Sequence, residues 1–204
     1  MTIITYLVSF ECENEVTAIE SLCQRLQRRY ACCPAFFMGS LQNACEEAFS
    51  STVIKERRPV LVYIHNDENM FNNIFCCSIF CSSTIIDYLL ENYIVWPCDV
   101  TFECNRNRLR SVWEEMFSTQ VHDNFNEEQC PMLIGIMRLF EEKKNDSVKV
   151  EYQVKSLLVG DTLTRTQVKS NRETVLNELA IFKEECDENE QALVSICCRY
   201  FMPY

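Results

Sequence analysis

Cysteine is the residue type in this chain that offers the most chemistry, and 14 of its 204 residues are cysteines. A thiol becomes a good nucleophile when its pKa is lowered, for example at the N-terminus of a helix. The natural place for such a thiol here is residues 65–73, where a predicted strand gives way to a helix, but no cysteine occurs there. Cys76, Cys77 and Cys81 come one to three helical turns later, and we interpret them as packed helix residues.

Two further observations bear on thiol chemistry. Cys77 and Cys81 are four residues apart and would share a helix face, but a disulfide at that spacing strains the bond geometry. Cys130 stands beside Pro131 as a lone thiol, which we interpret as a half-buried small residue. A thiol–disulfide oxidoreductase or redox sensor that uses Cys76, Cys77 or Cys130 is the alternative hypothesis.

Other catalytic arrangements are weaker. His65 ends a predicted strand and could act as a general base oriented by Asp67 and Glu68, but no GxSxG elbow supplies a nucleophile. We therefore interpret His65 as a hydrogen-bonded structural residue and His122 as a solvated one. No CxxC spacing occurs and glycines number three, so neither a zinc site nor a glycine-rich phosphate loop is expected, and no cofactor is predicted.

The charge balance disfavours nucleic acid as a partner. The formal net charge is −11, and the two dense basic runs, residues 55–58 and 106–110, are short. No apolar run reaches the length of a transmembrane helix and no signal peptide is recognised. With cysteines placed in apolar runs and in adjacent pairs, the sequence favours reduced thiols and a cytoplasmic or nuclear location.

Hydrophobic periodicity predicts the elements that must position these residues. Helices are expected where apolar residues recur at spacings of three and four, and strands where short apolar runs lie between turn signals. The strands are residues 34–38, 60–65, 93–101, 132–140 and 150–159; the helices are residues 15–30, 41–49, 74–81, 83–90, 105–117 and 171–198.

From residue 34 onward, with the helices at residues 74–81 and 83–90 counted as one helical segment, this order reads β-α-β-α-β-α-β-β-α, which predicts an α/β fold of the thioredoxin-like type, a three-layer sandwich with a mixed central sheet. A flavodoxin-like sheet fits less well, because the chain closes with a hairpin and a helix. We expect an N-terminal extension over residues 1–24, the domain over residues 25–198 and a tail over residues 199–204.

In such a fold a cis-proline precedes the fourth strand, and Pro131 between Cys130 and Met132 occupies that place. The groove beside this proline accepts extended chains. We predict that Met70, Phe71, Cys130 and Met132 line it together with Pro131, because soft, adaptable side chains suit a binding surface.

Long ordered stretches of the chain resemble the UAS domain of the Fas-associated factor 1 and UBX-domain adaptor family. Among them are Tyr-Ile-His-Asn-Asp-Glu at residues 63–68, Ile-Val-Trp-Pro-Cys-Asp-Val-Thr at 94–101 and Cys-Pro-Met-Leu-Ile-Gly-Ile-Met at 130–137; further stretches are residues 28–30, 33–41, 48–49, 73–76, 81 and 105–108. The resemblance covers about residues 25–190.

The resemblance implies a thioredoxin-like domain without catalysis. Family adaptors bring ubiquitylated clients to the valosin-containing AAA ATPase in proteasomal degradation, including degradation at the endoplasmic reticulum, which adds the surface of that organelle to the expected locations. They carry a ubiquitin-binding module before the UAS domain and a UBX module after it; neither is recognised in these 204 residues, so direct binding of ubiquitin or of the ATPase is not expected from them.

Some family members bind long-chain unsaturated fatty acids through basic residues and self-associate in response. By local charge, Arg106, Arg108 and Arg110 are the candidates here, against the simpler interpretation of a solvated helix start. The leading hypothesis is therefore a binding and scaffolding module, without cofactor, that forms homo-oligomers with lipid. A third hypothesis is a structural remnant with protein partners alone.

Overall fold

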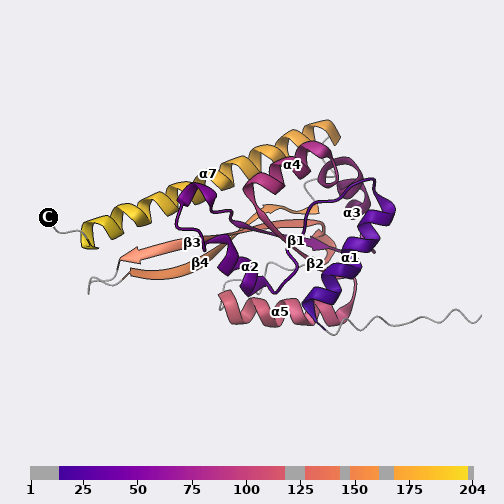
Figure 1. Ribbon diagram of the computed structural model, residues 1–204. Helices are drawn as coiled ribbons and strands as arrows, with labels where there is room; N and C mark the ends of the chain where they lie inside the picture. The colour runs from indigo at the N-terminus through magenta and orange to yellow at the C-terminus, as the bar shows by residue number, and fades with distance from the viewer. Residues whose placement is uncertain (1–13, 118–126, 143–147, 161–167, 202–204) are drawn as a thin grey trace, which may run out of the picture.

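The computed structural model describes residues 14–117, 127–142, 148–160 and 168–201. Its centre is a four-stranded mixed sheet in the order β2-β1-β3-β4 (Figure 1). The strands are β1 (Val60–His65), β2 (Ile94–Asp99), β3 (Met132–Glu142) and β4 (Val148–Leu158). Strands β1 and β2 run parallel, while β3 is antiparallel to both β1 and β4. The predicted mixed α/β sandwich is confirmed.

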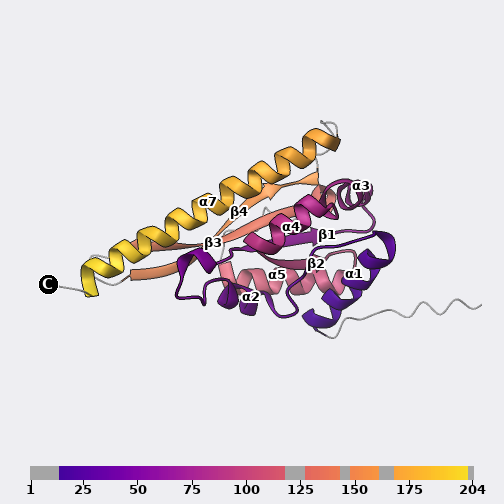
Figure 2. The same cartoon turned by 45° about the horizontal axis from the view of Figure 1, so that its top comes forward.

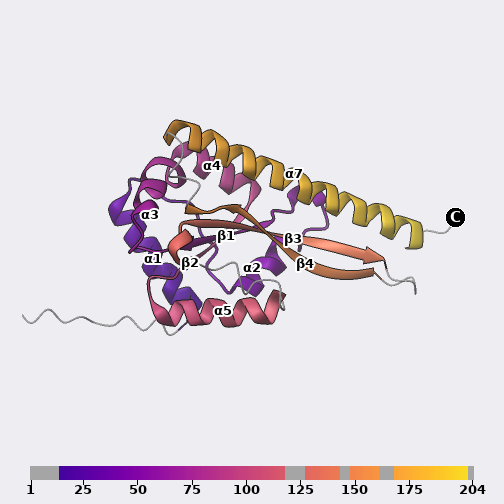
Figure 3. The same cartoon turned by 180° about the vertical axis from the view of Figure 1, so that it is seen from behind.

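Helices cover both faces of the sheet, as the views from above and from behind show (Figures 2 and 3). Helices α2 (Leu41–Ala48) and α5 (Glu103–Phe117) lie on one face, and α4 (Ser83–Asn92) and α7 (Val168–Phe201) lie on the other. Helix α1 (Glu15–Arg29) crosses the end of the sheet near β2, and α3 (Met70–Phe75) follows β1. Short turns, η1 (Ile54–Glu56), η2 (Cys76–Phe80) and η4 (Glu127–Gln129), complete the described elements.

Strand β1 explains why the core has two halves. All six of its residues are buried, and successive side chains point to opposite faces. Val62 packs with α2 and α5, whereas Leu61 and Tyr63 pack with α4 and α7. A strand that is buried on both faces needs a continuous apolar run, and residues 60–64 provide it.

The expected first strand, residues 34–38, is wrong as a strand. This segment forms one isolated parallel bridge between Phe36 and Val95, with the Phe37 N–H donating to the Val95 carbonyl at 2.8 Å. Along the edge of β2 that faces this segment, hydrogen-bonding groups recur every second residue, so the next donor after Val95 would be the N–H of residue 97. Proline has no N–H, and the pairing stops there.

The domain boundary expected after residue 24 falls inside helix α1, whose Ile19, Leu22 and Leu26 are all buried in the core. Residues 1–13 of the expected extension, residues 202–204 of the expected tail and His122 lie outside the described residues. Within the described part of the chain, no single helix is long and apolar enough to cross a membrane; one pair, Met70–Phe80 with Ser83–Asn92, passes the same test together across an 81° bend.

Gly135 of β3 allows helix α7 to pack against the sheet. A Cβ atom at this position would lie 2.3 Å from the ring of Phe182, which is fully buried. Gly135→Ala should therefore lower the free energy of unfolding by about 1–3 kcal/mol, because a packed core resists added volume. Chemical denaturation of the purified variant measures this loss.

Two further variants test the cause. Gly39→Ala should cost less, because the added atom would meet the half-buried, movable ring of Phe37. Combining Gly135→Ala with Phe182→Leu should cost at least about 1 kcal/mol less than the sum of the single changes. If the free-energy losses of the two single changes simply added in the double variant, the contact between residue 135 and Phe182 would be contradicted.

Candidate functional site

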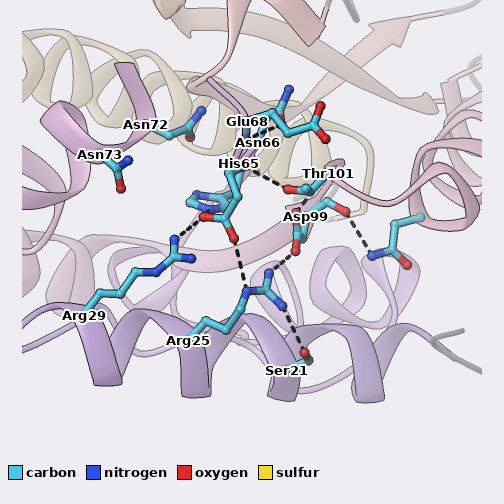
Figure 4. Close-up of polar contacts among 12 residues, drawn as sticks. Ser21, Arg25, Arg29, His65, Asn66, Glu68, Asn72, Asn73, Asp99 and Thr101 are labelled. Atoms are coloured by element: carbon cyan, nitrogen blue, oxygen red, sulfur yellow. Dashed lines mark hydrogen bonds and ion pairs between the residues drawn. The ribbon is translucent and has the colours of Figure 1, made fainter. Parts of the chain in front are cut away.

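The polar residues of the predicted site gather at the carboxyl ends of β1 and β2, next to helix α1, which runs along the bottom of the view (Figure 4). His65 ends β1 and Asp99 ends β2, and the two residues are partners in the parallel pairing. Both are buried, at 1 % and 3 % exposure. Asp67 follows His65 in the turn that leads to α3.

Two arginines of α1 neutralise the carboxylates at these strand ends. The guanidinium of Arg25 pairs with both Asp67, at 3.3 Å between Nε and Oδ2, and Asp99. Arg29, one helical turn later, also pairs with Asp67. We call Arg25, Arg29, Asp67 and Asp99 the strand-end ion-pair cluster. Buried carboxylates are tolerated only when they are paired, so this cluster joins α1 to the sheet.

Backbone hydrogen bonds fix the loops that carry the cluster. The N–H of Asp67 donates to the Thr101 hydroxyl at 2.8 Å, and the N–H of Thr101 donates to the Asp99 carboxylate at 3.0 Å. The Asn105 amide, at the start of α5, donates to the Asp99 carbonyl at 2.9 Å. The two strand ends therefore hold each other in place.

A buried chain of hydrogen bonds runs from the cluster into the core. His65 Nε2 lies 2.9 Å from Asp67 Oδ1, and His65 Nδ1 lies 2.7 Å from the hydroxyl of Tyr63. That hydroxyl lies 3.1 Å from the sulfur of Cys76. Burial alone would lower the pKa of His65, but the hydrogen bonds with Asp67 and Cys76 outweigh it and raise the pKa to about 9.

The thiol of Cys76 has the opposite shift. Its hydrogen bond with Cys81 lowers its pKa most, burial opposes this, and hydrogen bonds with His65 and Tyr63 add to the lowering, so that the pKa is about 5. The pKa of Cys81 is raised, chiefly by the same contact with Cys76. A thiolate at Cys76 and an imidazolium at His65 thus stabilise each other in the core.

The expectation that Cys77 and Cys81 share a helix face is wrong, because the structure aligns Cys81 with Cys76 instead. Residues Cys76–Phe80 form a π-turn rather than an α-helical one, and the Cys81 N–H donates to the Cys76 carbonyl at 3.0 Å. Widening the turn by one residue brings Cys81 over Cys76 instead of over Cys77. Cys77, which was expected to share a face with Cys81, is exposed.

The predicted groove residues separate into two environments. Met70 is 68 % exposed and Phe71 is half-buried at the start of α3. Cys130, Pro131 and Met132 are buried, and Met132 joins the core on the α5 face. The Cys130–Pro131 peptide bond is cis, as predicted. Cys130 and Met132 thus face the interior rather than a groove surface.

The three predicted lipid-binding arginines lie on α5 in different surroundings. Arg110 is exposed, whereas Arg106 and Arg108 are half-buried. Arg108 lines a small pocket of about 20 Å³, whose walls include Ile19, Trp96 and Leu109. It also lines a shallow surface pocket beside Glu15. Neither pocket includes Arg106 or Arg110 among its lining residues.

Sequence reasoning placed Asp67 beside His65 but missed the arginines that pair with Asp67. The spacing of four between Arg25 and Arg29, which places them on one face of their helix, was a signal that could have found them. The acidic end of β2 at Asp99 was a second signal. Tyr63 gave no signal, because an aromatic residue in an apolar strand is typical of the core. No group of three or more metal-ligating side chains converges anywhere in the described ranges.

Comparison with known proteins identifies the family. A family model described as Fas-associated factor 1 matches residues 22–163. The chain belongs to the Fas-associated factor 1 family. The predicted resemblance is confirmed, and this chain is a UAS-type module of that adaptor family.

Individual relatives agree with the family assignment. FAS-associated factor 1 of Homo sapiens and of Rattus norvegicus are each 33 % identical over 129 residues, which cover 61 % of this chain and 20 % of the relative. UBX domain-containing protein 3 of Caenorhabditis elegans is 35 % identical over 72 residues, 35 % of this chain and 12 % of the relative. The chain thus matches about a fifth of the length of the Fas-associated factor 1 proteins.

The ion-pair cluster predicts a specific loss of stability. Asp67→Asn should lower the free energy of unfolding at pH 7 by about 2–3 kcal/mol, because it leaves Arg29 and the charged ring of His65 without their carboxylate. The hydrogen bond from His65 and then the pairing with Arg29 outweigh burial and lower the pKa of Asp67 below its ordinary value of about 4. Its stabilising effect is therefore present above that value and is lost as the pH falls through the lowered folded-state pKa.

Urea denaturation at pH 7, 5 and 3 tests both statements. The difference in the free energy of unfolding between wild type and Asp67→Asn should be the same at pH 5 as at pH 7, and smaller at pH 3. Glu68→Gln, which changes the exposed neighbouring carboxylate, should stay within about 0.5 kcal/mol of wild type throughout. Equal effects of the two variants would contradict the cluster.

Proposed function

We propose that this chain is a non-catalytic UAS binding module of an adaptor in the ubiquitin–proteasome system. The observation that carries the proposal is the strand-end ion-pair cluster. At the position where a redox-active thioredoxin fold presents its cysteine pair, this chain places Asp67, which is held by Arg25 and Arg29. Ion pairs occupy the turn that would carry a reactive thiol.

The described thiols support this proposal through their burial. Exchange with a protein disulfide requires a thiolate that can approach the target sulfur. Cys76 has the lowered pKa but is 0 % exposed, and Cys130 is 1 % exposed. Cys77 is exposed, but it lies outside the buried network that activates Cys76. The cysteine with the lowered pKa and the cysteine that solvent reaches are therefore different residues.

The role in the ubiquitin system follows from family membership. The family's adaptors deliver ubiquitylated clients to an AAA ATPase, and we propose that this chain contributes a scaffolding surface to such an assembly. The proposed location is the cytoplasm or nucleus, including the cytoplasmic surface of the endoplasmic reticulum. A reducing compartment fits the cysteines that the structure describes, all of which are free thiols.

The proposal predicts binding without reductase activity. The full chain, tagged and expressed in cells under proteasome inhibition, should co-precipitate ubiquitin conjugates and the AAA ATPase indirectly, through other proteins of the adaptor assembly, because direct binding of either is not expected from these residues. In a separate assay, the purified chain should not accelerate the reduction of insulin by dithiothreitol, because no activated thiol is accessible. Immunoblotting and the rate of insulin precipitation are the two measurements.

A redox-active thioredoxin is the control for both assays: it should accelerate insulin reduction and should not enrich ubiquitin conjugates. Reduction of insulin by this chain at a comparable rate would overturn the non-catalytic part. Absence of both ubiquitin conjugates and the ATPase would overturn the adaptor part.

A second function, binding of a long-chain unsaturated fatty acid with self-association, is favoured by the surroundings of Arg108. A fatty acid needs a cation for its carboxylate beside an apolar surface for its chain. Arg108 lines the pocket walled by Ile19, Trp96 and Leu109. Glu15 shares this pocket; burial raises the pKa of its carboxyl, while the hydrogen bond from the Leu41 N–H and the charge of Arg108 act in the opposite direction. We propose Arg108 as the main lipid contact.

The lipid proposal predicts that oleate, but not stearate, increases the particle mass measured by light scattering below micelle concentrations. Arg108→Ala should weaken this response about tenfold or more, which is the expected effect of losing a charge-assisted hydrogen bond. Arg108→Lys should retain part of it, because the charge remains. Arg110→Ala, a change at an exposed arginine of the same helix, is the control and should respond as wild type does. If Arg110→Ala weakened the response to oleate as much as Arg108→Ala does, the pocket at Arg108 would not be the lipid-binding site.

A further inference from the structure

The π-turn η2 aligns two cysteines that an α-helix would separate. In an α-helix, residues five apart point in directions about 140° apart around the axis. The wider π-turn, closed by the hydrogen bond from the Cys81 N–H to the Cys76 carbonyl, places residue i+5 over residue i. Cys76 and Cys81 therefore lie on the same side of the helix.

Aromatic packing holds this geometry in place. Phe75 and Phe80 are also five residues apart, and the π-turn lets both rings stack in the core, with centroids 5.3 Å apart and planes at 24°. The ring of Phe80 also packs against the ring of Tyr63, with the two centroids 4.3 Å apart. All three rings are 0 % exposed. A return to α-helical geometry would remove one phenylalanine from this cluster, and the alignment of the two cysteines follows from the same constraint.

The two thiols shift each other's pKa. The interaction with Cys81 is the largest influence on the pKa of Cys76, which it lowers, and the interaction with Cys76 is the largest influence on the pKa of Cys81, which it raises. Cys76 also lies 3.1 Å from the hydroxyl of Tyr63. The pair thus combines a thiol that ionises readily with one that keeps its proton. Dithiols that exchange with disulfides commonly show such an asymmetry.

The surroundings decide how an oxidant can reach the pair. Cys76 is 0 % exposed, whereas Cys81 is 8 % exposed and is the one of the two that solvent reaches. Cys32 is exposed next to it, and its thiol donates to the Cys81 carbonyl at 2.9 Å. A small molecule can therefore meet Cys81 from the side of Cys32, while a folded protein substrate cannot approach Cys76.

We propose that Cys76 and Cys81 form an oxidisable dithiol that closes to an intramolecular disulfide on reaction with a low-molecular-weight disulfide such as glutathione disulfide. Cys81 passes its proton to the Cys76 thiolate as its sulfur attacks one sulfur of the small disulfide, whose S–S bond breaks, and the small thiolate that is released takes this proton from Cys76. The Cys76 thiolate then attacks the Cys81 sulfur and expels the second small thiolate. The two cysteines lose two electrons and one proton, and the small disulfide becomes one thiol and one thiolate.

Closure of this disulfide changes the buried polar chain. The Cys76 thiolate interacts with Tyr63 and His65 in the reduced state, and a disulfide sulfur carries no charge for these interactions. His65 in turn contacts Asp67 of the strand-end ion-pair cluster. The oxidation state of the dithiol is therefore coupled to the loop that follows β1, a modification site distinct from the proposed binding function.

Chymotrypsin provides a direct test, because it cleaves after Phe75 and Phe80 and leaves the two cysteines on separate peptides. The reduced full-length chain is equilibrated with glutathione disulfide at pH 7.5, acid-quenched, alkylated, digested and analysed by mass spectrometry. The peptide Cys76–Phe80 should be disulfide-linked to the peptide that begins at Cys81 in most molecules. Dithiothreitol before the quench should abolish the link.

Cys77→Ser is the matched control, because Cys77 lies on the same peptide but is exposed. The link should persist in Cys77→Ser and disappear in Cys76→Ser and Cys81→Ser. Loss of the link in Cys77→Ser, whose exposed position should not affect folding, would overturn the proposal. So would a link from Cys81 to the Cys32 peptide, or mixed glutathione adducts without a Cys76–Cys81 link in the wild-type chain.

Discussion

The pairing of Arg25 with Asp67 and Asp99 is the interaction on which the rest of this structure depends. Parallel strands β1 and β2 end side by side, and each end carries a carboxylate that is wholly or largely removed from water. Such charges destabilise a fold unless a cation compensates them. Helix α1 supplies that cation, and its position then allows Ile19 and Leu26 to enter the two halves of the core.

The same pairing sets the chemistry of the loop after β1. Asp67 is held by α1 on one side and contacts His65 on the other, so the imidazole stays protonated in a buried site. The protonated ring in turn favours a thiolate at Cys76. An ion pair that stabilises the fold thereby extends as a chain of charges into the core. The charged groups of Asp67 and His65 lie where a redox-active thioredoxin-like fold carries its reactive cysteines, but the sulfur of Cys76 is buried in the core.

Much of this could be predicted from sequence, and the failures have identifiable physical causes. The strands over residues 60–65 and 132–140 were predictable because buried runs of β-branched residues have few other uses. The segment at residues 34–38 failed as a strand because Pro97, on a different strand, lacks the donor that it needs. The π-turn was not predictable from local pattern, since the stacking of Phe75, Phe80 and Tyr63 selects it. Likewise, nothing local indicates that Cys130 and Met132 face the core.

Burial of Cys76 reconciles a binding module with a responsive thiol. An exposed thiolate would react with many partners, whereas the fully buried thiolate of Cys76 reacts only with what reaches Cys81 first. That arrangement excludes protein disulfides on steric grounds and admits small ones, so it suits sensing rather than catalysis. Because Cys76, His65 and Asp67 form one hydrogen-bonded chain, a change at the sulfur must alter the electrostatic balance at the strand ends. Helix α1, which Arg25 and Arg29 tie to those ends, is the element through which such a change would reach the surface.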